Sequence, residues 1–134
     1  MEDQLTDISS RADIELLVHE FYQKVKKDEL IGPIFHKLGP EFWDYHTPIM
    51  VEFWSGILLH VGNYPGGLIW KHIMVDKHSP LEAEHFARWK KLFTAALYEH
   101  FQGPVADEAL TRVKVVEQVM LAKIKASRNP GFIQ

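Results

Sequence analysis

Apolar residues recur at the spacing of an α-helix along most of this chain. The first such stretch follows a capping pattern, Ser10 with Asp13 three residues later, and predicts a helix over residues 11–27. Its apolar face comprises Ile14, Leu17, Val18, Phe21, Tyr22 and Val25. Gly32 and Pro33 then indicate a turn.

A second helical pattern covers residues 41–60, and it contains a proline. Pro48 has no N–H to donate to the carbonyl of Asp44, and its ring clashes with that carbonyl, which costs about 3 kcal/mol in a regular helix. Two arrangements are open: either Thr47 caps a helix with Pro48 in its first turn, or a short leading turn is kinked at Pro48. In the first arrangement His46 would lie outside the helix and could swing toward solvent. One side of the pattern comprises Phe42, His46, Met50, Phe53 and Ile57, and Trp43, Trp54 and Leu58 widen it.

The next long helix is predicted from its start signal. Ser79, Pro80 and Glu82 supply an N-cap, a first-turn proline and a capping-box glutamate, so we expect this helix to begin at Ser79. Gly103 and Pro104 indicate its end. Its buried stripe comprises Leu81, His85, Trp89, Leu92, Phe93 and Ala96.

The remaining segments complete the helical pattern. Residues 61–67 read as a loop, and residues 68–78 are apolar but too short to assign by periodicity. We expect a last helix over residues 105–126 that ends at Asn129-Pro130-Gly131. Its inward positions are Ala109, Val113, Val116, Met120 and Ile124. No stretch alternates with period two, so the predicted fold class is all-α.

Length and charge narrow the class of protein further. A chain of 134 residues and 15.6 kDa suits one sizeable core, and we expect a single domain over 1–134 with its core over about 11–126 and flexible termini. The net charge of −3 and the lack of a basic run argue against nucleic acid or an anionic membrane as a partner. With neither a signal peptide nor a run of about 18 apolar residues, the expectation is a cytoplasmic protein.

Histidine is abundant and cysteine is absent, which limits the possible chemistry. The chain has eight histidines and no cysteine, so disulfides, thiolate ligands and a cysteine nucleophile are excluded. Zinc on one helix would need paired histidines four residues apart. A di-iron bundle would need two Glu-x-x-His pairs, and only Glu82 with His85 forms one. A Ser-His-Asp arrangement has no support, and Gly66-Gly67 lacks phosphate-loop spacing.

His72 is the histidine in the most suggestive place, an apolar segment just before Ser79. There an all-helical domain can offer an imidazole to a metal-bearing cofactor, although an ordinary half-buried histidine would look the same. Tyr22, His46 and Trp89 lie on the predicted buried faces of three different helices, each with a polar atom that needs a partner. Aromatic residues make up 12% of the chain, enough to thicken a core or to line a site for a flat ligand.

At these positions the chain resembles the truncated haemoglobins, most closely their third group. The family's first signature is similar to Phe21-Tyr22-Gln23-Lys24-Val25, Asp28 and Gly32-Pro33-Ile34-Phe35. Its distal helix is similar to Trp43-x-x-His46 followed by Phe53-Trp54-x-Gly-x-Leu58, and its proximal region to Lys71-His72 followed by Phe86-x-x-Trp89-x-x-Leu92-Phe93. The resemblance runs from about residue 14 to 124 in family order. It implies a two-over-two helical sandwich around haem b.

The resemblance also implies roles for individual residues. His72 matches the proximal ligand of the haem iron, and Phe35, Trp89 and Phe93 are expected to contact the haem. Tyr22, His46 and Trp89 match the distal polar residues, and Met50 falls where an apolar residue meets bound ligand. Pro48 departs from the pattern of the distal helix, and Gly66-Gly67 is a loop feature more typical of other groups of the family.

The implied function is tight binding of O2 and other diatomic or small anionic ligands. A hydrogen bond to a ligand that takes up charge contributes about 1.5–3 kcal/mol, so Tyr22 and Trp89 together would slow oxygen release by roughly two or more orders of magnitude. That argues against bulk oxygen transport and favours nitric oxide dioxygenation or peroxide chemistry, with a reductase as partner and a monomeric protein. The alternative is a cofactor-free helical interaction domain, colourless when purified, whose aromatic residues only fill a core.

Overall fold

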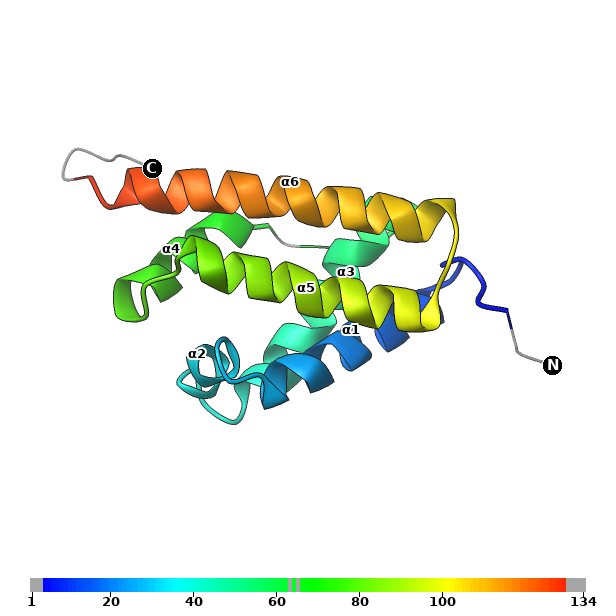
Figure 1. Cartoon of the computed structure of the whole chain (residues 1–134), viewed down its shortest axis with the longest axis horizontal. Helices are drawn as coiled ribbons and strands as arrows, with labels where there is room; N and C mark the ends of the chain where they lie inside the picture. Colours follow the sequence, from blue (N-terminus) through cyan, green and yellow to red (C-terminus); the bar gives the residue numbers. More distant parts are fainter. Residues whose placement is uncertain (1–3, 63, 65, 130–134) are drawn as a thin grey trace.

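The computed structural model describes residues 4–62, 64 and 66–129, and within them the chain forms six α-helices (Figure 1). They are α1 (Arg11–Lys27), α2 (Gly32–His36), α3 (Phe42–Leu59), α4 (Leu68–His78), α5 (Ala83–His100) and α6 (Pro104–Ser127). Beside them, the described part of the chain contains an isolated parallel bridge between Thr6 and Phe101. The all-α prediction is confirmed.

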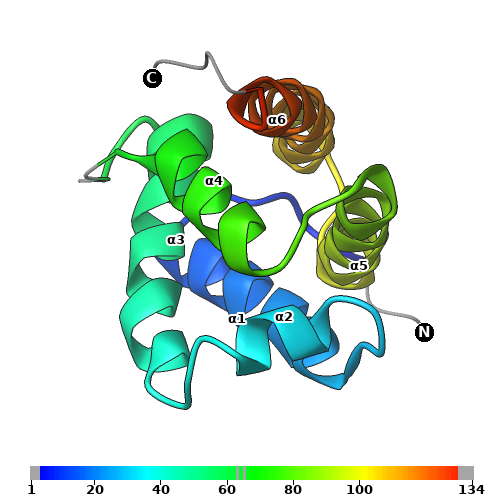
Figure 2. The same cartoon turned by 90° about the vertical axis from the view of Figure 1, so that its left-hand side faces the viewer.

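The helices form two pairs. Helix α1 packs against α3, and α5 packs against α6, while contacts of α1 with α5 and of α3 with α6 join the pairs (Figures 1 and 2). Helix α4 packs mainly on α6, and the short α2 packs on α1. This is the two-over-two arrangement that the resemblance implied.

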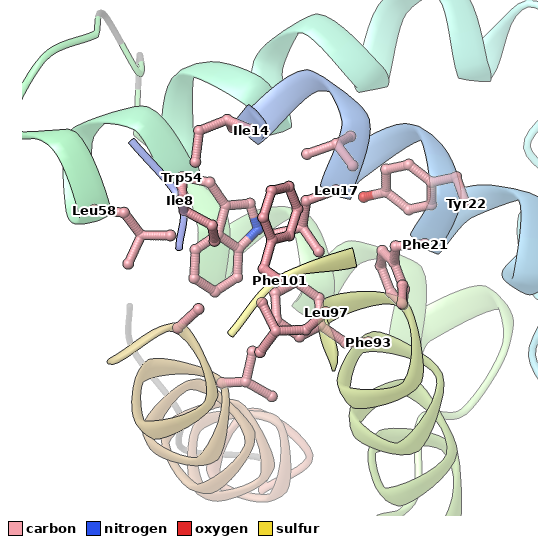
Figure 3. Packing of buried hydrophobic residues seen from close by; sticks show 14 of the residues in the cluster. Ile8, Ile14, Leu17, Phe21, Tyr22, Trp54, Leu58, Phe93, Leu97 and Phe101 are labelled. Carbon is pink, nitrogen blue, oxygen red and sulfur yellow. The ribbon is translucent and has the colours of Figure 1, made fainter. Parts of the chain in front are cut away.

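The hydrophobic core is divided into two clusters. The larger cluster joins α1, α3, α5 and the start of α6, and Figure 3 shows its rings, among them Trp54, Phe93 and Phe101. The smaller cluster lies around α4 and the end of α6 and comprises Ile73, Leu81, Phe86, Met120 and Ile124. Trp89 on α5 is partly buried and packs against both clusters.

The segment before α1 belongs to the fold, so the core begins earlier than the expected residue 11. Ile8 is 2% exposed within the larger cluster, and the N–H of Gln102 donates to the carbonyl of Thr6 at 2.9 Å. The carboxylate of Asp7 accepts from the backbone N–H groups of Val105 and Ala106, each at 2.9 Å. Residues 1–3 and 130–134, for which flexible termini were expected, lie outside the described residues.

Asp7 therefore does for α6 what a capping side chain at its N-terminus would do. The residue at that position is Gly103, with φ at +145°, a conformation that favours glycine. A Cβ at Gly103 would also lie only 2.5 Å from Cγ of Asp7. Both facts explain why a glycine stands between α5 and α6.

The first and last helices agree closely with the sequence patterns. Helix α1 has the predicted bounds, and the capping box of Ser10 and Asp13 is formed. Helix α6 begins one residue before and ends one residue after the predicted 105–126. Of the residues predicted to end it, Asn129 follows the helix, whereas Pro130 and Gly131 lie outside the described residues.

The predicted helix start at Ser79 is wrong. Ser79 is the C-cap of α4, and α5 begins at Ala83 with Glu82 as its N-cap. The N–H of Glu82 donates to Nδ1 of His85 at 2.8 Å, so His85 completes a capping box instead of joining the buried stripe. The N–H of Leu81 is bound by the side chain of Asp76 on α4, which holds residues 79–82 as a connection.

Two other segments gain structure that periodicity did not assign. Residues 68–78 form α4, which begins after Gly67 in a left-handed conformation. Gly32 and Pro33 start the five-residue α2, where the proline fits the first turn. Among the described residues, no helix combines the length and apolarity needed to cross a membrane.

We predict that Asp7→Ala lowers the free energy of unfolding by about 1–2 kcal/mol, as loss of a helix cap does. Burial alone would raise the pKa of Asp7, but the N–H donors of Val105, Ala106 and Ile8 outweigh it and hold that pKa below its usual value. The stabilisation is complete above the unfolded-state pKa of about 3.9 and is lost as pH falls through the lower folded value. Urea unfolding at pH 7 and at pH 3 measures both effects.

Glu108→Ala is the matched control, because Glu108 is an exposed acid on α6 that pairs with Arg112 one turn away. Its loss is expected to change stability by less than about 0.5 kcal/mol. Equal losses in the two variants would contradict the capping role of Asp7.

Candidate functional site

A mostly apolar pocket lies between the two hydrophobic clusters. Phe21, Tyr22 and Trp54 line it from the larger cluster, and Leu81 and Phe86 line it from the smaller one. Side chains from all six helices contribute to its wall. The division of the core is therefore the result of a cavity rather than of two separate domains.

Six of the seven residues predicted for the site line this pocket. They are Tyr22, Phe35, His46, Met50, His72 and Trp89. Phe93, for which a haem contact was predicted, is the exception: it is 1% exposed and lies in the larger cluster, outside the residues that line the pocket. Its ring stacks on Trp54 with centroids 4.9 Å apart and lies edge-to-face with Phe21 at 5.4 Å, so core rings surround it (Figure 3).

His72 is held by its own helix in a state that suits a metal ligand. Its Nδ1 lies 2.7 Å from the carbonyl oxygen of Leu68, one turn earlier in α4. Because a carbonyl can only accept, Nδ1 carries the hydrogen, and in the neutral ring Nε2 keeps its lone pair. Burial lowers the pKa of His72 more than the bond to Leu68 raises it, which favours the neutral ring. A neutral imidazole oriented through its other nitrogen is a good iron ligand.

Tyr22 and His46 form a hydrogen-bonded pair in the same pocket. The Tyr22 hydroxyl lies 2.7 Å from Nε2 of His46, and Phe42 stacks on the imidazole with ring centroids 4.6 Å apart. Burial raises the pKa of Tyr22 far above its usual value. Burial, with the charges of His72 and Lys71, lowers the pKa of His46 to about 4, so both side chains are neutral at pH 7.

The tautomer of His46 decides what this pair can offer a ligand. If Nε2 is unprotonated, it accepts the Tyr22 proton, and the hydroxyl is engaged within the pair. If Nε2 carries the hydrogen, it donates to the Tyr22 oxygen and leaves the phenol proton for a third group. In this second tautomer the pair offers the phenol O–H as a donor, and in either tautomer it places no charge in the apolar pocket.

Pro48 does not displace His46 from the pocket. Helix α3 runs through Pro48 with Glu41 as its N-cap, so the arrangement in which Thr47 caps a later helix is wrong. Asp44, whose carbonyl would have bonded to the N–H that proline lacks, is exposed, as is Pro48 itself. Water can satisfy that carbonyl, which reduces the cost of the proline.

We predict that Pro48→Ala raises the free energy of unfolding, by up to about 3 kcal/mol, because it restores a helix bond and a good helix former. Urea unfolding measures the gain, and the Tyr22–His46 bond should persist because α3 is already continuous. Thr47→Ala, which alters the neighbouring residue but no backbone donor, is the control. A destabilised Pro48→Ala would contradict this account of the proline.

Comparison with known proteins identifies the family. No model of a known protein family matches the chain. It is, however, 33% identical over 106 residues to the group 3 truncated haemoglobin Ctb of Campylobacter jejuni, an alignment that covers 77% of this chain and 81% of that protein. The chain belongs to the group III truncated haemoglobins. The crystal structure of the group III truncated haemoglobin from Campylobacter jejuni matches with a TM-score of 0.80 and 28% identity, over 90% of this chain and 95% of that one.

The predicted resemblance is thus confirmed, and the Gly66-Gly67 pair does not move the chain to another group. As a truncated haemoglobin it is a globin-type protein that binds small ligands, and the family implies a haem cofactor. The residues present fit that group, because the pocket is lined by aromatic rings and offers one neutral imidazole nitrogen. In the described part of the chain, no three His, Asp or Glu side chains are grouped to hold a metal ion, and Glu82 and His85 are engaged in capping α5.

Sequence reasoning did not assign four other polar residues to the pocket of this truncated haemoglobin. Tyr45, Tyr64, Lys71 and His85 also line it, and Tyr45 is 68% exposed. Lys71 is exposed and directly precedes His72. Its place next to that histidine was the one sign in the sequence that it lies at the site. Polar residues at a pocket's rim have the same helical pattern as an ordinary solvated face, so periodicity alone does not separate them.

Proposed function

We propose that this protein holds a haem b in the pocket between its two clusters and binds O2 and other small ligands tightly. The observation that carries the proposal is the state of His72, whose Nδ1–H is fixed on the carbonyl of Leu68 while the ring lines an apolar pocket. A haem bound there would supply an iron that takes diatomic or small anionic ligands and changes oxidation state.

The pocket residues would divide the work of holding the group. Phe35, Met50, Trp89 and Phe86 offer apolar surface to a flat macrocycle. Lys71 and Tyr45 are exposed where they line the pocket, so the ammonium and the phenol could bind the carboxylates of haem at the solvent edge. His72 would provide the bond to the metal.

Tyr22 sets the affinity for ligand in this proposal. With His46 protonated at Nε2, the phenol proton of Tyr22 stabilises a ligand that gains negative charge in the pocket, and the indole N–H of Trp89 is the second donor. Two such donors would slow ligand release by roughly two or more orders of magnitude. Slow release favours nitric oxide dioxygenation or peroxide chemistry over bulk oxygen transport, with a reductase supplying electrons. A monomeric, cytoplasmic protein is part of the same proposal.

His72→Ala is predicted to abolish stable haem binding, because the pocket then keeps its rings and loses its one proximal nitrogen. His78→Ala is the control, since His78 lies on the same helix but is exposed and outside the pocket wall. Haem content after purification and the Soret band after reconstitution measure the result. Haem loss in His78→Ala but not in His72→Ala would assign the ligand to His78.

Tyr22→Phe is predicted to raise the oxygen dissociation rate by about 10- to 100-fold, the value of one hydrogen bond of about 1.5–3 kcal/mol. Stopped-flow displacement of oxygen by carbon monoxide measures this rate. Tyr98→Phe is the matched control, because the Tyr98 hydroxyl donates to Asp107 and lies outside the pocket wall. Equal dissociation rates in wild type and Tyr22→Phe would contradict the donor role.

The competing function, a cofactor-free interaction domain, makes opposite forecasts. It requires a colourless, cooperatively folded protein that shows no Soret band after incubation with haem. In that case Trp89→Ala would lower stability alone, since Trp89 packs on both clusters. Family membership and the state of His72 support the haem protein instead.

A further inference from the structure

Asp76 is a buried carboxylate placed one helical turn after His72. It is 7% exposed on α4, and Ser55 is the other buried polar residue in the described part of the chain. Its Oδ1 accepts from the N–H of Leu81 at 2.8 Å and from Nη2 of Arg128 at 2.5 Å. Its Oδ2 accepts from Nε of Arg128 at 3.1 Å. A buried charge requires such partners, and here all of them come from outside α4.

Arg128 connects three parts of the fold through one guanidinium. It follows directly on α6, whose C-terminal end lies at the same end of the molecule as α4 (Figure 1). Besides Asp76, it donates to the carbonyl of Leu81 at 3.0 Å and lies 3.1 Å from Oε1 of Glu82. The end of α6, the C-terminal half of α4 and the connection to α5 are thereby fixed together.

These contacts matter for the pocket because α4 has few other supports. Its main packing partner is α6, through Ile73 against Met120 and Ile124 in the smaller cluster. Val75, adjacent to Asp76, and Leu81 both line the pocket. A shift of α4 along α6 would move His72 and this wall together, since an 11-residue helix moves as a unit.

We propose that the Arg128–Asp76 ion pair is a positioning element for His72. By fixing α4 against the end of α6, it sets where the imidazole stands in the pocket, so the residue just past the last helix tunes the bond between His72 and a haem iron. Arg128 is not itself one of the residues that line the pocket, and it acts through Asp76 and through Leu81, whose carbonyl it bonds. This inference rests on the proposed haem-binding function.

The test compares holoproteins of wild type, Arg128→Gln, Arg128→Lys and the control Arg112→Gln, whose guanidinium forms only an exposed pair with Glu108 on α6. Resonance Raman spectra of the ferrous, ligand-free proteins report the iron–histidine stretching band, and transfer of haem to an excess of apomyoglobin reports its release. Arg128→Gln should shift or broaden the band and speed release about tenfold or more, the effect usual for residues that orient a metal ligand. Arg128→Lys keeps the charge but cannot bind both oxygens of Asp76, so its band and release rate should lie between those of wild type and Arg128→Gln. Arg112→Gln should match wild type.

A purely structural pair would give a different result. If Arg128→Gln lowers the urea midpoint but leaves the band and the release rate unchanged, the proposal is overturned. If Arg128→Gln fails to fold, the double variant Asp76→Asn/Arg128→Gln, which removes both charges, takes its place and should show an iron–histidine band shifted from that of wild type. A wild-type band in the double variant or in Arg128→Lys overturns the proposal. A wild-type protein that takes up no haem refutes the proposed function itself, which is a separate outcome.

Discussion

The division of the hydrophobic core is the constraint on which the rest of this structure depends. Protein interiors are normally packed as densely as organic crystals, yet here a pocket separates the cluster around α1, α3 and α5 from the cluster around α4. Trp89 packs against both clusters and so connects them. The high aromatic content therefore builds walls as well as a core, and a flat ligand between those walls would add the missing contacts and stabilise the fold by binding.

Polar atoms in such a wall must be satisfied without a ligand, and the way they are satisfied determines the chemistry. The bond of His72 to Leu68 uses one ring nitrogen and leaves the other with its lone pair. The bond between Tyr22 and His46 uses one of their two protons and leaves one. Both arrangements keep the side chains of Tyr22, His46 and His72 neutral, so these groups are oriented before a ligand arrives.

The sequence predicted what local patterns control. The ends of α1 and α6 and the lining role of six site residues follow from capping signals, helical spacing and family motifs. Phe93 shows a limit of periodicity. Its place on a buried helix face predicts that the side chain is inside the protein, but not which hydrophobic cluster it joins. Pro48 shows another: α3 continues through it, with Trp43 before the proline and Trp54 after it packed in the larger cluster while Pro48 itself is exposed.

The misplaced helix start at Ser79 has a long-range cause, and so does the unpredicted support of α6. Residues 79–82 are kept out of α5 by Asp76 and Arg128, which are 52 positions apart, and the N-terminus of α6 is capped by Asp7, nearly a hundred positions away. No local pattern could show either contact. Together they place a carboxylate at the N-terminal end of α6 and a guanidinium at its C-terminal end, which is the favourable sense for the helix dipole at both ends. Helix α6 is thus held at both of its ends, and α4, which carries His72, packs mainly on it.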